Sequence, residues 1–213
     1  YLADTVVRQL AISETQKFGH VTYFFNGNRA EKFSEELEDY VEVPSDRVPF
    51  EQRPWMKAAE ITDNVIEAMN SGKYRFIRVN FANGDMVGHT GVFPAVQIAV
   101  ETVDLCLGRL IPAAQAAGAI LVISADHGNS DDMYEHAKDG SVIKDKATGR
   151  PKARTAHSLN PVPAIIYDPS NAAGVKLTDK KGLGISSLAA TCLNLIGYQT
   201  PEGYDPSLLE IGS

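Results

Sequence analysis

The chain has 213 residues, of which 44% are hydrophobic and 22% are charged, and its formal net charge is −7 at pH 7. This composition is typical of a globular protein with a sizeable core, and the negative charge argues against nucleic acid as a partner, because nucleic-acid binding needs a basic face. No apolar stretch approaches the roughly 20 residues of a membrane span, so we predict no membrane partner. Cys106 and Cys192 fall in apolar helical patterns, which predicts buried free thiols and a cytoplasmic location.

The first quarter of the chain mixes short elements with loops. Residues 8–13 are expected to form a strand, and residues 13–18 read as a capped helical turn. Residues 20–25 are rich in aromatic and β-branched side chains, which favours a second strand. Residues 30–42 are charged and are expected to lie on the surface, and a proline-punctuated loop follows over 44–54.

The remaining elements alternate more regularly. An amphipathic helix is predicted over 56–69, a strand over 74–80 and a long helix over 93–117. Residues 119–124 are continuously apolar, which predicts a strand that is buried on both faces. A further strand at 162–167 and a helix at 183–195 complete the pattern. This order predicts an α/β fold, with a mostly parallel sheet sandwiched by helices.

Three short clusters combine aspartate with histidine near the ends of predicted strands. Asp85 and His89 follow one strand, Asp126 and His127 follow another, and His157 precedes a third. In open α/β sheets, ligands bind outside the carboxyl ends of the strands. Asp85 and His89 are four positions apart, so a helical turn would place both on one face. Carboxylate and imidazole are the ligands of catalytic Zn²⁺ or Mn²⁺ sites, so we predict a metal centre with hydrolytic or phosphoryl-transfer chemistry.

Four longer motifs carry a resemblance to a known family. They are Ser-Glu-Thr-Gln-Lys-Phe-Gly-His-Val-Thr at 13–22, Asn-Phe-Ala-Asn-Gly-Asp-Met-Val-Gly-His-Thr-Gly at 80–91, Ser-Ala-Asp-His-Gly-Asn at 124–129 and His-Ser-Leu-Asn-Pro-Val-Pro at 157–163. In this order they resemble cofactor-independent phosphoglycerate mutase, a member of the alkaline-phosphatase superfamily of metalloenzymes. The resemblance extends from about residue 8 to residue 209. It implies interconversion of 3-phosphoglycerate and 2-phosphoglycerate, in glycolysis and gluconeogenesis, through a phosphoserine intermediate on two divalent metals.

The resemblance also implies how the metals are held. One metal would be bound by Asp85, His89 and His157, and the other in part by Asp126 and His127. Mn²⁺ is the expected ion, with Mg²⁺ or Co²⁺ as alternatives.

Lys17 matches the catalytic lysine of the family, which lies near the phosphoryl group. A positioned ammonium can neutralise charge on phosphate oxygens. His20 and His136 are not carried over as ligands. His20 could orient a group beside Lys17 or simply pack, and His136 is expected to be solvated.

Two parts of the family pattern have no match here, namely the nucleophilic serine with its neighbouring aspartate and the inserted transferase domain that grips the substrate. Thr15 and Ser124 are the nearest candidates for a nucleophile, and turn structure and strand-end placement explain them better. Residues 1–213 are therefore expected to be the C-terminal portion of an incomplete metallophosphatase domain, inactive alone and partnered by the N-terminal part of a monomeric enzyme. A start at Tyr1 without methionine fits a fragment, and an ordinary processed terminus is the alternative.

Two other classes of function remain open. A related phosphohydrolase or phosphopentomutase would share the metal ligands, although the motif around Lys17 disfavours both. A non-catalytic metal-binding partner module would also keep these residues. The charged stretch from Ser130 to Ala156 either closes over the site or forms a surface excursion.

Overall fold

The computed structural model describes residues 1–170 and 174–210. The chain forms two compact units, and the helix Phe93–Ala117 runs from one into the other. The first unit comprises Tyr1–Ala113 with His127–Pro161, and the second comprises Ala114–Asp126 with the chain from Val162 onward. Within the described part of the chain, no helix combines the length and the apolarity that crossing a membrane requires.

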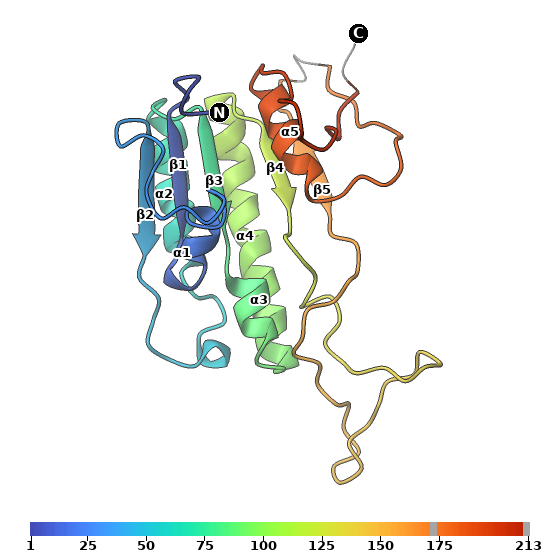
Figure 1. The fold of residues 1–213 in the computed structure, drawn as a ribbon. Helices are drawn as coiled ribbons and strands as arrows, with labels where there is room; N and C mark the ends of the chain where they lie inside the picture. The colour runs from blue at the N-terminus through green and yellow to red at the C-terminus, as the bar shows by residue number, and fades with distance from the viewer. Residues whose placement is uncertain (171–173, 211–213) are drawn as a thin grey trace. The chain divides into compact units, whose positions relative to one another are not determined.

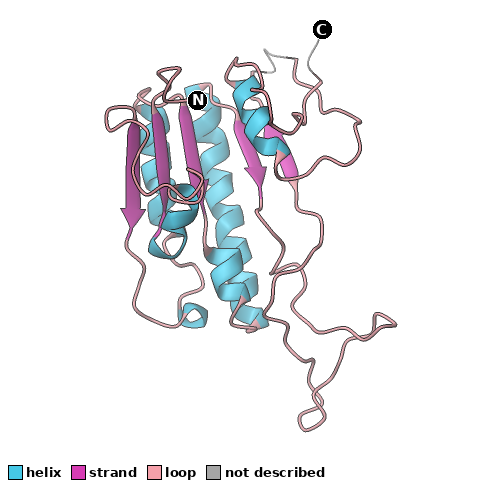
Figure 2. Ribbon diagram, viewed as in Figure 1, coloured by secondary structure: helices cyan, strands magenta, loops and turns pink. Residues whose placement is uncertain are grey.

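A parallel three-stranded sheet organises the first unit (Figure 2). The central strand β1 (Gln9–Glu14) lies between β2 (Glu38–Val43) and β3 (Phe76–Asn80). Ile12 is in register with Val41 on one side and with Val79 on the other. All residues of β1 are buried, because the strand has a neighbour on each edge and is covered on each face.

Helices cover both faces of this sheet (Figure 1). Leu10 and Ile12 of β1 pack against Ile61 of α2 (Ala58–Asn70) and Leu110 of α4 (Phe93–Ala117), in the main hydrophobic core. The short helix α1 (Thr15–Val21) covers the other face, where Arg78 of β3 donates a hydrogen bond of 2.6 Å to the carbonyl of Val21.

A second core lies at the end of the unit where β3 stops. It joins α3 (Asn83–Gly88) to the first turns of α4, and the single-turn helix η1 (Phe50–Gln52) packs nearby. Its central members are Val87 and Ala99, both fully buried, with Met56 and Met133 from flanking loops. This core fixes α3 against α4 and so fixes the direction in which α3 presents its polar side chains.

The second unit is smaller. Strand β4 (Leu121–Ser124) pairs antiparallel with β5 (Ala164–Tyr167), and α5 (Ser187–Leu195) follows. Thr191 is fully buried in α5 and accepts a hydrogen bond of 2.9 Å from the backbone of Leu208, which ties the C-terminal segment to the helix.

The α/β fold class and the positions of most elements are confirmed. The prediction of a strand at 20–25 is wrong, because the hydrogen bonds from Phe24 N to Gly19 O and from Thr22 Oγ1 to Phe18 O continue the helical turn. The surface segment predicted at 30–42 ends in β2, whose first residue, Glu38, is only 1% exposed. Its carboxylate accepts hydrogen bonds from the backbone of Phe33 and Ser34, which offsets the cost of burying a charge.

Two further expectations need correction. The strand predicted to be buried on both faces, β4, is only partly buried, and it pairs antiparallel with β5. Within the described residues, β4 pairs with β5 alone, so a ladder covers only one of its edges. Both cysteines are free thiols as expected, but only Cys106 is fully buried, whereas Cys192 is partly exposed.

Candidate metal centre

The centre is built around Asp85, which α3 presents just beyond the end of β3. The strand ends at Asn80 and the helix begins at Asn83, so only a short turn separates them. His89 directly follows α3 and, as the four-residue spacing predicts, lies on the same face as Asp85. Its Nε2 is 3.0 Å from Asp85 Oδ1.

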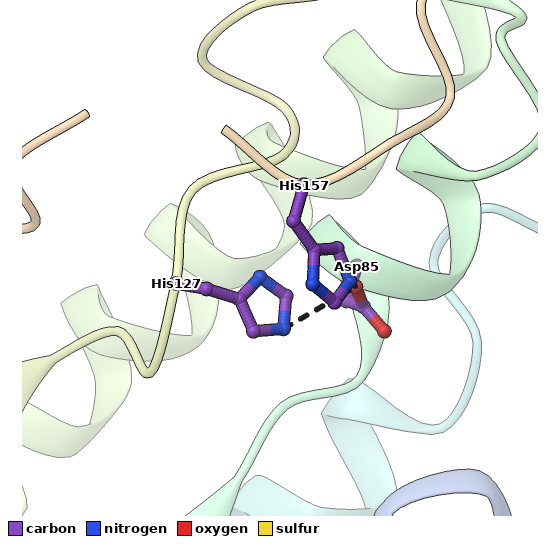
Figure 3. A group of neighbouring side chains, drawn as sticks. All are labelled: Asp85, His127 and His157. Carbon is purple, nitrogen blue, oxygen red and sulfur yellow. Dashed lines mark hydrogen bonds and ion pairs between the residues drawn. The ribbon is translucent and has the colours of Figure 1, made fainter. Parts of the chain in front are cut away.

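Two more imidazoles reach the same carboxylate oxygen from distant parts of the sequence (Figure 3). His157 Nε2 lies 3.0 Å from Asp85 Oδ1 and 3.2 Å from His89 Nε2. His127 Nε2 lies 3.5 Å from the same oxygen, and its ring stacks on that of His157 with a centroid distance of 3.6 Å. Asp85, His127 and His157 thus form a group whose ligand atoms are close enough to share one ion.

The protonation of His89 indicates what this cluster can bind. Its Nδ1 lies 2.6 Å from the carbonyl oxygen of Thr155, which can only accept, so Nδ1 carries the proton. In the neutral ring, Nε2 then directs a lone pair at Asp85 Oδ1 and His157 Nε2. Lone pairs that converge at such distances repel one another unless a cation or a proton lies among them. A divalent cation fits this set of donors, because neutral imidazole and carboxylate are the ligands that first-row dications prefer.

Lys17 approaches Asp85 from the opposite side. It is the third residue of α1, its side chain is buried, and its Nζ lies 2.6 Å from Asp85 Oδ2. Burial raises the pKa of Asp85, but the hydrogen bond from Lys17 and the positive charge of its ammonium outweigh burial and hold that pKa below its usual value. Asp85 is therefore a carboxylate with one oxygen toward the ammonium and the other toward the imidazoles.

The remaining candidates lie as follows. Asp126 directly precedes His127 but belongs to the second unit, and its side chain is exposed, so its role in a second metal site stays a prediction.

The Thr15 hydroxyl donates to Glu42 Oε1 at 2.7 Å, in line with a turn role, and Ser124 is partly buried at the end of β4. His20 lies in the last turn of α1, where its exposed ring contacts Phe24 edge to face. His136 is exposed, as expected, and its Nε2 lies 3.7 Å from Asp132 Oδ1.

Sequence reasoning missed the groups that orient the candidate ligands. The carbonyl of Thr155 holds the ring of His89, and the amide of Asn129 lies 3.5 Å from Asp85 Oδ1. Asn129 lies within the Asp-His-Gly-Asn motif, so its position could have suggested a role. No sequence pattern singles out a backbone carbonyl such as that of Thr155.

The stretch from Ser130 to Ala156 has a structured base and an exposed tip. Near the base, the backbone N–H of Arg154 donates to Met133 O at 2.9 Å, and its guanidinium donates to Asp132 at 2.8 Å and to the carbonyl of His157 at 3.1 Å. Residues 136–150 are all exposed. The base therefore contacts the cluster through Thr155 and Arg154, while the tip is a surface excursion.

Comparison with known proteins places this geometry in context. The chain matches the metalloenzyme superfamily over residues 1–200. It is 48% identical over 212 residues to the 2,3-bisphosphoglycerate-independent phosphoglycerate mutase of Trypanosoma brucei brucei, and 47% identical over 211 residues to a probable enzyme of that name from Leptospira interrogans. Each alignment covers 99% of this chain and 38% of the relative.

A solved structure agrees with these relatives. Phosphoglycerate mutase of Leishmania mexicana, crystallised at low cobalt concentration, superposes with a TM-score of 0.96 and 46% identity. The match covers 100% of this chain and 39% of that one, so the chain spans less than half the length of the proteins it resembles. The family match over most of the sequence, together with the converging carboxylate and imidazoles, shows that this chain belongs to the metalloenzyme superfamily.

Proposed function

We propose that this chain is the metal-binding C-terminal portion of a 2,3-bisphosphoglycerate-independent phosphoglycerate mutase, an isomerase that interconverts 3-phosphoglycerate and 2-phosphoglycerate. The observation that carries the proposal is the convergence of His89, His127 and His157 on Asp85, with Lys17 on its other oxygen. Relatives of that name match almost the whole chain. The N-terminal part of such an enzyme is then the partner of this chain.

In this proposal Asp85, His89 and His157 hold one divalent ion, and Asp126 and His127 contribute to a second. The ions of two-metal centres lie about 3.5–4 Å apart, so ligands of both can belong to one cluster. That geometry is compatible with His127 lying 3.5 Å from Asp85 and stacking on His157. When bound, the ions supply Lewis acidity to the oxygens of a phosphoryl group. Mn²⁺ is the ion we propose, with Co²⁺ or Mg²⁺ as alternatives.

The side chains of this chain have separate tasks in the reaction. Asp85 keeps its charge, because the hydrogen bond and charge of Lys17 lower its pKa. The Thr155 carbonyl holds His89 in the tautomer that directs Nε2 into the cluster. Lys17 is buried beside the centre and carries a positive charge that can act on the equatorial oxygens of a transferring phosphoryl group. The free thiols of Cys106 and Cys192 support a reducing compartment, which we propose to be the cytoplasm.

The proposal is tested by joining this chain to the N-terminal part of the Trypanosoma relative and following conversion of 3-phosphoglycerate to 2-phosphoglycerate in Mn²⁺. The joined protein should turn over, and its Asp85→Asn variant should not. Release of inorganic phosphate instead would indicate a phosphohydrolase, and turnover of phosphopentoses alone would indicate a phosphopentomutase. A folded, metal-loaded protein without any of these activities would favour a non-catalytic module.

A further inference from the structure

The candidate ligands come from three separate segments, and contacts beyond the ligands hold these segments together. Asp85 and His89 belong to α3 and the residue after it, His127 begins a loop after β4, and His157 lies at the end of the excursion. A centre assembled from three segments binds metal tightly only if the segments are already ordered, since ordering them on binding costs free energy.

Asp131 joins the segment of His127 to the segment of His157. The hydroxyl of Ser158 donates to Asp131 Oδ2 at 2.8 Å, and the side-chain amide of Asn160 donates to the same oxygen at 2.6 Å. The backbone N–H of Ser158 donates to the carbonyl of Gly128 at 2.8 Å. Gly128, Asp131, Ser158 and Asn160 form what we call the clasp. Gly128 directly follows His127 in sequence, and Ser158 directly follows His157.

Gly128 shows how closely the two segments approach. A Cβ at this position would lie less than 3.0 Å from Ser158 Oγ and from Asp131 Oδ1. Real side chains do not tolerate such distances, so the clasp closes only over a glycine. The stacked rings of His127 and His157 are each the immediate neighbour of a clasp residue, which explains their fixed relative position.

The same loop is attached to α3. Ser130 Oγ donates to the carbonyl of Gly84 at 2.5 Å, and the buried side chain of Asn129 lies against Gly88. The loop over 128–131 is therefore bonded on one side to the helix that carries Asp85 and on the other to the segment that carries His157.

We propose that Asp131 is a positioning residue that holds His127 and His157 in binding geometry before the metal arrives. This inference rests on the proposed function only in that the cluster binds a divalent ion. Asp131 does not belong to the group of side chains whose ligand atoms could share one ion, and its Oδ2 accepts the hydrogen bonds of Ser158 and Asn160.

The test is a titration of the metal-free 213-residue chain with Co²⁺, followed by calorimetry and by the visible absorption of the bound ion. Asp131→Ala should raise the dissociation constant about tenfold or more, as is typical when a group that orients metal ligands is removed. It should also change the Co²⁺ spectrum, which reports ligand geometry. Asp131→Asn should restore most of the affinity, because both hydrogen bonds go to one oxygen that an amide carbonyl can replace.

Asp139→Ala is the matched control. Its carboxylate also accepts a serine hydroxyl, from Ser141 at 2.7 Å, but it lies on the exposed tip of the excursion. This variant should bind Co²⁺ as the parent chain does. Ser158→Ala should weaken binding in the same sense as Asp131→Ala, and the double variant should be no weaker than the worse single variant, because both act through one bond.

The outcomes separate this inference from the proposed function. A parent chain that binds no Co²⁺ would contradict the metal centre itself. A parent chain that binds, with Asp131→Ala binding equally well and with an unchanged spectrum, would overturn the role of Asp131. If circular dichroism shows that Asp131→Ala does not fold, Ser158→Ala decides, since it removes only a hydroxyl, and unchanged affinity in that variant would overturn the role.

Discussion

At the scale of single residues, Asp85 connects every part of the candidate centre. One carboxylate oxygen faces Lys17 of α1, and the other faces imidazoles from three positions in the chain. This division keeps the carboxylate ionised in a site where only 13% of its side chain is exposed. An ammonium on one side and candidate metal ligands on the other place a positive charge next to the proposed ion site, an arrangement that can stabilise the charge of a phosphoryl group.

Replacement of Lys17 should separate catalysis from metal binding. In the joined mutase, Lys17→Ala should lower kcat by at least about a hundredfold, because its charge would act on the transition state, while the metal content stays close to that of the parent protein. Steady-state kinetics with 3-phosphoglycerate and metal analysis of the purified variant measure both. Lys73→Ala is a suitable control, since Lys73 pairs with Asp39 on the surface. Loss of metal in parallel with activity would instead assign Lys17 a structural role.

A buried acid near the start of α1 makes stability depend on pH. Glu14 is 2% exposed, and burial raises its pKa above the ordinary 4.5 despite a hydrogen bond from the backbone of Lys57. A group whose pKa is raised on folding stabilises the protein below its unfolded pKa, and this contribution is lost as the pH rises through the folded pKa. Glu14→Gln lacks this titration, so its stability relative to the parent chain should increase as the pH rises above 4.5.

Urea unfolding of both proteins from about pH 4 to 8 measures the difference. Asp39→Asn is a control of opposite sign, because the hydrogen bond from Lys73 lowers the pKa of Asp39 below its ordinary 3.8. That contribution is complete above pH 3.8 and is lost only in more acidic solution, so the effect of Asp39→Asn should be constant between about pH 5 and 8. A constant difference for Glu14→Gln as well would show that Glu14 does not titrate in this window.

At the scale of elements, the centre depends on close contact between α3 and the loop that follows His127. The two glycines of α3 test this contact in different ways. A Cβ on Gly88 would lie less than 3.0 Å from Asn129 Oδ1, whereas a Cβ on Gly84 would lie 3.5 Å from Ser130 Oγ, an ordinary contact. The first substitution should separate the two segments, and the second should not.

Gly88→Ala should therefore destabilise the chain by about 1–3 kcal/mol, the usual cost of overpacking. Gly84→Ala should be neutral or stabilising by up to about 1 kcal/mol, since alanine favours a helix over glycine. Thermal and urea unfolding compare the two, and Co²⁺ titration should show weaker binding for Gly88→Ala alone. Equal stability of both variants would mean that Asn129 moves aside at little cost.

At the scale of the whole molecule, the chain spans 38% of the length of its relatives, so the reaction that we propose needs more than this chain. The isolated chain should give background conversion of 3-phosphoglycerate at every Mn²⁺ concentration, because a mutase must hold the phosphoryl group on a nucleophile between two positions of the substrate. A coupled assay measures this, with the joined protein as the positive control. Turnover by the isolated chain would direct the search for a nucleophile to Thr15 and Ser124.

The number of tight metal sites in the isolated chain follows from the same consideration. In the proposed function, Asp85, His89 and His157 would offer three ligands for one ion, whereas Asp126 and His127 would offer two for another. Calorimetric titration with Mn²⁺ should thus show one strong site and one weak or absent site. Bound metal should also raise the melting temperature, since an ion at a hundred times its dissociation constant adds about 2.7 kcal/mol to stability. Two equally tight sites would contradict this distribution of ligands.

Local patterns in the sequence were sufficient to predict much of the fold. The helix at 93–117 was predicted with its observed bounds, because its apolar residues recur with helical period over many turns. The strand predicted at 20–25 failed, because aromatic and β-branched composition describes a preference that a preceding helix can override. Glu38 was not recognised as a buried strand residue, because charged side chains usually lie on the surface. Its burial depends on hydrogen bonds from the backbone N–H groups of Phe33 and Ser34, which no residue pattern announces.

The sequence by itself determined which residue types can hold a metal and that they lie next to predicted strands, since ligand chemistry and the spacing of Asp85 and His89 are local properties. Only the tertiary structure decided that His127 and His157 stack on each other and converge on one oxygen of Asp85, because they are 30 positions apart in sequence and the excursion lies between them. It also decided the roles of Asp131 and of the Thr155 carbonyl. Those contacts depend on how two loops close over Gly128, and no local pattern encodes a distance between segments that are remote in the chain.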